Sequence, residues 1–170
     1  MTRLGTVVAL LALSTGTAFA QGGLSAGHLG AAVGISFPTG ALARTHASGF
    51  NLGAIAEYEA PGQPMGVRGE FFYERFGGKT GVAGSRASQA TAGIIDAIYH
   101  VPDSPINAYF IAGMGIYDVT GNGTSPGFNG GVGIRIPLSG MTAYFEARLH
   151  KVLTNNSPYL SVPITFGLSF

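Results

Sequence analysis

The sequence of 170 residues contains no cysteine. A chain without cysteine has no lipid-attachment cysteine, no disulfide framework and no thiolate metal site. We therefore expect its stability to come from side-chain packing and backbone hydrogen bonds.

Charged residues are also scarce, at 10% of the chain, whereas a soluble domain usually contains about a quarter. The formal net charge is only +1, and basic residues are scattered among acidic ones along the sequence. Binding to nucleic-acid phosphates needs basic residues gathered in one patch. The sequence therefore predicts no nucleic-acid partner.

Long apolar runs are missing after Leu13. The run from Val7 to Leu13 follows Arg3 and precedes Ala18-Phe19-Ala20. This pattern predicts a secretory signal peptide over residues 1–20, and the run is too short for a retained anchor, which needs about 20 apolar residues. Residues 21–28 are expected to form a short flexible leader. The remaining residues, 29–170, fit one domain.

An exported chain with positive mean hydropathy and no helical span has one other way to be integral to a membrane. Inside lipid, only helices and closed barrels satisfy every backbone hydrogen-bonding group. Apolar and polar residues alternate with period two in eight segments, which predicts eight strands. The segments are 29–37, 50–58, 67–76, 89–101, 107–117, 128–136, 143–150 and 159–170. Segments 89–101 and 107–117 are apolar on both faces, so their facing stays open.

The expected connections alternate in length, as they do in outer-membrane barrels. Longer ones cover 38–49, 77–88, 118–127 and 152–158, and shorter ones cover 60–66, 102–106 and 138–140. The longer loops would present polar side chains to the exterior. These are Arg44, His46, Lys79, Arg86, Asn122 and Asn155. Tyrosines near strand ends predict rings at the bilayer interface. They are Tyr58, Tyr99, Tyr109, Tyr117 and Tyr159.

The face of the predicted strands that carries small and polar residues also carries charges of both signs, and these charges would meet inside the barrel. They are Glu57, Arg68, Glu70, Glu74, Asp96, Arg135, Glu146 and Arg148. Buried charges must be paired or hydrated. An eight-stranded barrel has an interior just wide enough for side chains. We therefore expect a plugged lumen, with a narrow porin-like solute path as the alternative.

The last segment alternates strictly up to a terminal Phe170. With the signal peptide and the eight segments, it makes the chain resemble the small eight-stranded bacterial outer-membrane β-barrel family. The resemblance implies an all-β, antiparallel, up-and-down transmembrane barrel, placed as a monomer among outer-membrane lipids. It also implies that Phe166, Leu168 and Phe170 form an assembly signal for the barrel assembly machinery. No cofactor or metal is implied.

Two alternatives of other classes remain. Lipid A deacylase barrels carry a histidine at the rim and a serine two residues later. In this chain Val152 occupies the serine position after His150. Ser157 or Ser161 could take its place only if the loop folded back. We therefore expect no enzyme activity. A soluble periplasmic barrel that binds a lipophilic ligand would need apolar residues inside and polar residues outside.

Motifs that suggest other chemistry lack their structural context. Gly23–Gly27 matches a nucleophile elbow without the strand and helix that an elbow needs. Gly77–Thr80 ends like a phosphate loop, but no helix follows. The four histidines lie far apart, without metal-ligand spacing. The sequence predicts no catalytic or metal-binding residue.

Overall fold

The computed structural model describes residues 27–154 and 158–170. The predicted signal peptide, the first part of the leader and the predicted loop residue Asn155 lie outside these ranges. The eight strands are β1 (Gly27–Pro38), β2 (His46–Glu59), β3 (Met65–Gly78), β4 (Ser88–His100), β5 (Ala108–Val119), β6 (Gly123–Leu138), β7 (Met141–Val152) and β8 (Tyr159–Ser169). The single turn of helix α2 (Leu42–Thr45) follows β1.

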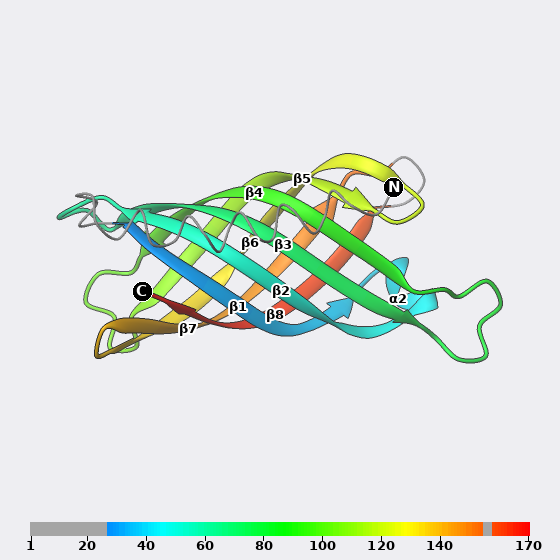
Figure 1. Ribbon diagram of the computed structural model, residues 1–170, viewed down its shortest axis with the longest axis horizontal. Helices are drawn as coiled ribbons and strands as arrows, with labels where there is room; N and C mark the ends of the chain where they lie inside the picture. Colours follow the sequence, from blue (N-terminus) through cyan, green and yellow to red (C-terminus); the bar gives the residue numbers. More distant parts are fainter. Residues whose placement is uncertain (1–26, 155–157) are drawn as a thin grey trace.

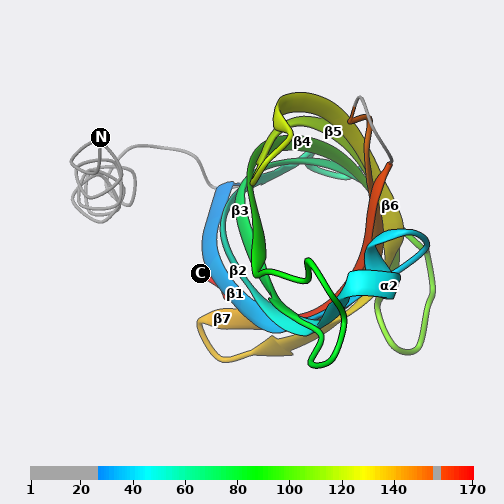
Figure 2. The ribbon, with the colours of Figure 1, turned by 90° about the vertical axis from the view of Figure 1, so that its right-hand side faces the viewer.

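The eight strands form one closed barrel in which each strand pairs antiparallel with the next, and β8 pairs with β1 (Figure 1). Figure 2 looks into the barrel from the end that carries α2. We call this the α2 end and the opposite one, where Phe170 lies, the C-terminal end. The predicted fold class is confirmed. No helix among the described residues is long and apolar enough to cross a membrane.

The seam between β1 and β8 closes the barrel through backbones that lie very close together. Gly34 pairs with Thr165 across this seam. A Cβ atom at Gly34 would meet the carbonyl oxygen of Ile164 and would lie 2.8 Å from Thr165 Cα. Only glycine permits this approach. At the end of the seam, Phe170 N donates to Leu29 O at 2.8 Å, and Leu29 N donates to Phe170 O at 2.9 Å.

Most strands are longer than expected, and β2, for example, begins at His46, four residues before its expected start. β1 begins at Gly27, two residues before the expected start of the barrel. The long loop expected over 118–127 is wrong, because the β5–β6 connection is only residues 120–122. Residues 123–127 look loop-like because of their glycine and proline, but they pair in register with Gly115 to Val119. The predicted alternation of loop length therefore holds only in part.

The outward face of the barrel is an apolar band. Ile95 on β4 is 67% exposed, and Phe110, Met114 and Ile116 on β5 are also exposed. These residues settle the facing of the two strands that the sequence left open. Similar exposed residues occur on all of the remaining strands. They include Val33, Ile35, Leu52, Val67, Phe71, Phe128, Val132, Phe145, Leu149 and Ile164.

The expected interfacial position is wrong for three of the five tyrosines. Tyr58 and Tyr99 do face outward, but Tyr109, Tyr117 and Tyr159 are buried inside the barrel. The reason is visible for Tyr109, whose partner on β6 is Gly133. A Cβ atom at Gly133 would occupy the position of the Tyr109 ring. An aromatic ring thus covers an inward glycine and fills a lumen that would otherwise have a void.

Candidate functional site

The candidate site is the interior of the barrel, and its charged part is built around two arginines. Arg68 on β3 makes ion pairs with Glu57 (2.9 Å from Nε) and Glu146 (2.8 Å from Nη1). Glu146 on β7 also accepts a hydrogen bond from Tyr109 OH at 2.7 Å. Because β3 and β7 lie across the barrel from each other, the Arg68–Glu146 pair spans the lumen.

Arg148 is the second centre and binds three carboxylates. Its guanidinium lies 2.6 Å from Glu70, 3.3 Å from Asp96 and 2.8 Å from Glu146. Glu146 therefore bridges both arginines. Asp96 also accepts a hydrogen bond of 2.7 Å from Asn129. Nearly every charge in this layer has a partner of opposite sign, which is the condition for burying charge at tolerable cost.

Arg135 lies closer to the C-terminal mouth and binds both Glu57 and Glu59. His100 Nε2 is 3.4 Å from the Glu59 carboxylate. Glu57, Glu59 and His100 lie close enough together to suggest a metal site. Both carboxylates already have the Arg135 guanidinium as an ion-pair partner, and Glu57 also pairs with Arg68, so the arrangement fits a salt-bridge cluster better than a cation site.

The half of the lumen toward the α2 end contains a buried apolar cluster beside buried polar side chains such as Glu74, His150 and Ser161. Its buried cluster comprises Phe72, Phe76, Ala90, Ala92, Ile94, Tyr117, Val119, Val152 and Tyr159. Leu42 of α2 packs against this cluster, and the helix lies at the rim of this mouth (Figure 2). Glu74 belongs to this half and makes no ion pair with the described residues, but it accepts a hydrogen bond of 2.8 Å from Ser161.

His150 lies inside the barrel and not at an accessible rim. Its exposed fraction is 0%, its ring centroid is 4.8 Å from that of Phe72, and Nδ1 lies 3.0 Å from Tyr117 OH. Ser161 is its partner across the β7–β8 ladder, without any folding back of the loop. The Ser161 hydroxyl donates to Glu74 and not to His150. The elements of a serine hydrolase are thus close together but wrongly connected for attack by the hydroxyl.

The inward side chains are buried in both halves of the lumen. Side chains that line a water-filled channel would be accessible to solvent, yet Arg68 is 1% exposed and Phe76 is 0% exposed. Arg148 and Tyr144 are also buried at successive levels between the two mouths. Paired charged side chains and uncharged aromatic ones are thus both buried in the interior.

The structure places all eight predicted lumen residues inside the barrel and brings seven of them into the ion-pair network, with Glu74 apart. The predicted lumen network did not include Tyr109, Tyr144 or Asn129, although alternation puts Tyr144 on the face of Glu146 and Asn129 on the face of Arg135. The available signal for the tyrosines is the glycine on the neighbouring strand. Tyr144, for example, pairs with Gly167 and lies over it.

The residues of the predicted assembly signal all face outward on the last strand. Phe166 packs against Phe145 of β7 with ring centroids 4.9 Å apart. Leu168 lies next along the same face, and Phe170 is 70% exposed. The predicted loop residues Arg44, Lys79, Arg86 and Asn122 are exposed at the α2 end, whereas His46 is half-buried against Thr45.

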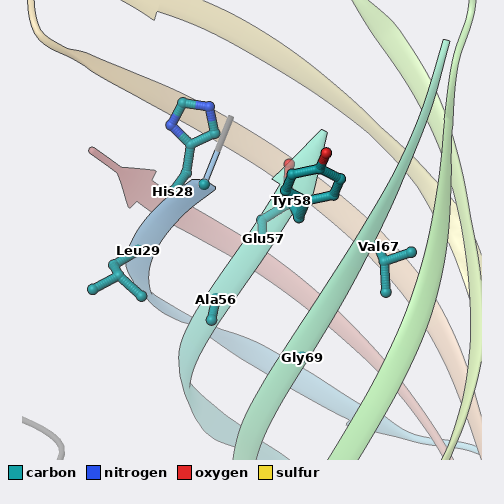
Figure 3. Close-up of a pocket in the computed structure, with 8 residues that line it drawn as sticks. His28, Leu29, Ala56, Glu57, Tyr58, Val67 and Gly69 are labelled. Atoms are coloured by element: carbon teal, nitrogen blue, oxygen red, sulfur yellow. The ribbon is translucent and has the colours of Figure 1, made fainter. Parts of the chain in front are cut away.

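An apolar hollow of about 380 Å³ lies in the wall at the C-terminal end of the barrel, where β1 and β3 begin and β2 ends (Figure 3). Most of its lining is outward-facing, with the small residues Ala56 and Gly69 lying among Leu29, Tyr58 and Val67. The hollow carries no set of catalytic groups, and it follows from small side chains in the apolar band.

Comparisons with known proteins agree with this architecture. No protein-family model matches the chain, and no curated protein matches it in sequence. Three solved structures are similar to it. Neisserial surface protein A has a TM-score of 0.67 at 17% identity, over 87% of this chain and 98% of that one.

The outer-membrane protein Ail of Yersinia pestis, in a phospholipid bilayer nanodisc, has a TM-score of 0.57 at 12% identity, over 85% of this chain and 99% of Ail. A major outer membrane protein of Thermus thermophilus has a TM-score of 0.51 at 14% identity, over 85% of this chain and 99% of that one. The chain therefore has the fold of the small eight-stranded outer-membrane β-barrels.

Proposed function

We propose that the protein is a non-enzymatic, monomeric barrel of the bacterial outer membrane, with an occluded lumen and a structural or surface-contact role carried by its exposed loops. The observation that carries this proposal is the continuous outward apolar band on a closed barrel. A closed barrel has no unpaired strand edge, so every backbone group in the band can be satisfied in lipid. The similar solved structures support the same location.

Export by the predicted signal peptide would place the C-terminal end in the periplasm and the α2 end outside. The connections at the α2 end, 39–45, 79–87 and 153–158, would then be the external loops. The two-residue β6–β7 turn, 139–140, would be periplasmic. The 79–87 loop and the 139–140 turn fit the usual arrangement of longer external loops and short periplasmic turns. The short 120–122 connection would be external and the longer 101–107 connection periplasmic, so the fit is partial.

The soluble lipophile-binding alternative is disfavoured by the facing of the strands. That alternative needs a polar exterior, but most exposed side chains on the strands are large and apolar. Its ligand would need a cavity in the half of the lumen toward the α2 end, where Phe72, Phe76 and Tyr159 pack together. The enzyme alternative is disfavoured by the burial of His150 and by the bond from Ser161 to Glu74.

The barrel and its occlusion can be tested on one refolded sample in detergent. We expect heat-modifiable mobility on cold SDS gels and no discrete current steps in planar bilayers, because paired side chains fill the lumen. Discrete steps would contradict occlusion and make the charged interior a solute path. A protein that stays folded in water without detergent would contradict the membrane location.

The assembly signal can be tested in cells. Deletion of Phe170 removes an exposed ring and the two closing hydrogen bonds with Leu29. We expect a strong decrease of the heat-modifiable form in the outer-membrane fraction, measured by immunoblot. Phe170→Tyr keeps the ring and both backbone bonds, so it is the matched control. Equal amounts of the deletion variant and the wild type would contradict the signal.

A further inference from the structure

Exposed positive charge is confined to one end of the barrel. Within the described ranges, every exposed lysine or arginine lies at the α2 end. These residues are Arg44, Arg75, Lys79, Arg86 and Lys151. The outward strand residues Tyr58, Met65 and Tyr99 at the C-terminal end are uncharged. Of the exposed acidic residues in the described ranges, Asp103 lies in the β4–β5 connection at the C-terminal end and Asp118 lies on β5 at the α2 end, opposite Thr91. The two boundaries of the apolar band therefore differ in charge, although the whole chain is nearly neutral.

Four of these cations gather around the tip of the β3–β4 hairpin. Residues 75–89 contain Arg75, Lys79 and Arg86 and no acidic residue. Glu74, directly before them, is buried in the lumen. No carboxylate of the hairpin tip therefore neutralises these three side chains.

Hydrogen bonds bring Arg44 to the same place. The loop after β3 is attached to α2, since Lys79 N donates to Thr45 O at 3.0 Å and Lys79 Nζ donates to Ala43 O at 2.5 Å. Ser85 Oγ also donates to Thr45 O at 2.5 Å. Figure 1 shows this loop beyond α2 at the same end of the barrel. We call Arg44, Arg75, Lys79 and Arg86 the cationic rim.

Arg75 differs from the other three because it points from a strand toward the lipid side. Its partners across the ladders are Phe50 on β2 and Gln89 on β4. Phe50 and Tyr73 form an aromatic pair with ring centroids 6.0 Å apart, and Tyr73 OH donates to Gln89 at 3.3 Å. An arginine at the edge of an apolar band can lay its stem on that band and hold its guanidinium at the headgroups.

We propose that the cationic rim binds the phosphate groups of an anionic lipid in the outer leaflet, while the acyl chains of that lipid lie on the wall formed by Phe50 and Tyr73. The proposal rests on the membrane location proposed above. Guanidinium groups suit phosphate because their planar fork donates two parallel hydrogen bonds. A soluble polyanion would reach the loop cations, but it would gain nothing from Arg75 on the lipid side.

The absence of tryptophan allows a direct test, because one introduced indole is then the only one in the protein. Phe50→Trp reports on lipid beside the rim, and Tyr58→Trp reports on the other end of the same strand. Each variant is prepared without the predicted signal peptide and is folded into phosphatidylcholine vesicles. The vesicles contain either brominated phosphatidic acid or brominated phosphatidylcholine. Fluorescence quenching gives the relative association constant of the two lipids at each end.

In the Phe50→Trp protein we expect a preference for phosphatidic acid that falls about fivefold when Arg75→Gln is added and again with Arg86→Gln, because each basic residue near a membrane surface contributes about that factor. The preference should weaken with added salt. In the Tyr58→Trp protein we expect no preference. Equal preference at both ends, or no change on adding Arg75→Gln, would overturn the proposal.

Three further outcomes separate the alternative explanations. Loss of the preference on addition of soluble polyphosphate, together with no effect of Arg75→Gln, would assign the rim to a soluble polyanion and overturn the lipid. Absence of quenching by either lipid at both ends would instead overturn the membrane location itself. Quenching by both lipids without preference would leave the membrane location intact and overturn only the headgroup site.

Discussion

Replacing Arg148 by methionine is expected to lower the free energy of unfolding by about 3–5 kcal/mol, the usual cost of removing one partner from a buried ion pair. The guanidinium holds Glu70, Asp96 and Glu146 inside the barrel. Glu146 keeps Arg68, but Glu70 and Asp96 lose their only ion pairs in the described part of the chain. Urea titration in lipid vesicles, followed by the heat-modifiable band, measures the loss.

Lys151→Met is the matched control for Arg148→Met, because Lys151 lies three residues later on β7 and is exposed. It should change stability little. The triple variant Arg148→Met/Glu70→Gln/Asp96→Asn removes the unpaired charges and should recover part of the loss. If the triple variant is no more stable than Arg148→Met, lost packing, and not unpaired charge, explains the effect.

Gly34→Val is expected to prevent closure of the barrel. The added side chain meets the backbone of β8 at Ile164 and Thr165, and a backbone cannot rotate away as a flexible side chain can. Overpacking typically costs about 1–3 kcal/mol, and more where the chain cannot relax. At a seam, that cost falls on the one pairing that completes the sheet. We expect little or no heat-modifiable species after refolding.

The control for Gly34→Val is Gly93→Val on β4. A Cβ atom at Gly93 meets no atom within 4 Å, so the same substitution should leave folding almost unchanged. Comparable refolding yields for the two variants on cold SDS gels would contradict the role of close approach at the seam.

The fold was largely predictable because strand residues alternate between two environments. Arg68, Glu70 and Arg148 share the inward parity on their strands, and period two alone places them in the lumen. Their partners could not be predicted in the same way. Arg68 and Glu146 are separated by 78 residues and meet only because the ladders around the barrel set their relative height.

The facing of β5 shows a different limit of sequence reasoning. Tyr109 and Phe110 are both aromatic, so alternation does not say which one enters the lumen. The decision comes from Gly133 on the next strand, which leaves space for one ring. That pairing depends on the register of β5 against β6, and the register is fixed by the three-residue connection 120–122, which the glycine and proline around it made look like a longer loop.

The seam between β1 and β8 makes this barrel a protein of mixed contact order. Seven of its strand pairings join neighbours in sequence, but the eighth joins Gly30 to Ser169. Seven hairpins can form locally, whereas the eighth must bear the loop-closure entropy of almost the whole barrel. Contacts of such long range slow folding. Since β8 follows the other seven strands in the chain, a nascent chain that lacks it can reach at most an open sheet, and closure must wait until β8 has been synthesised.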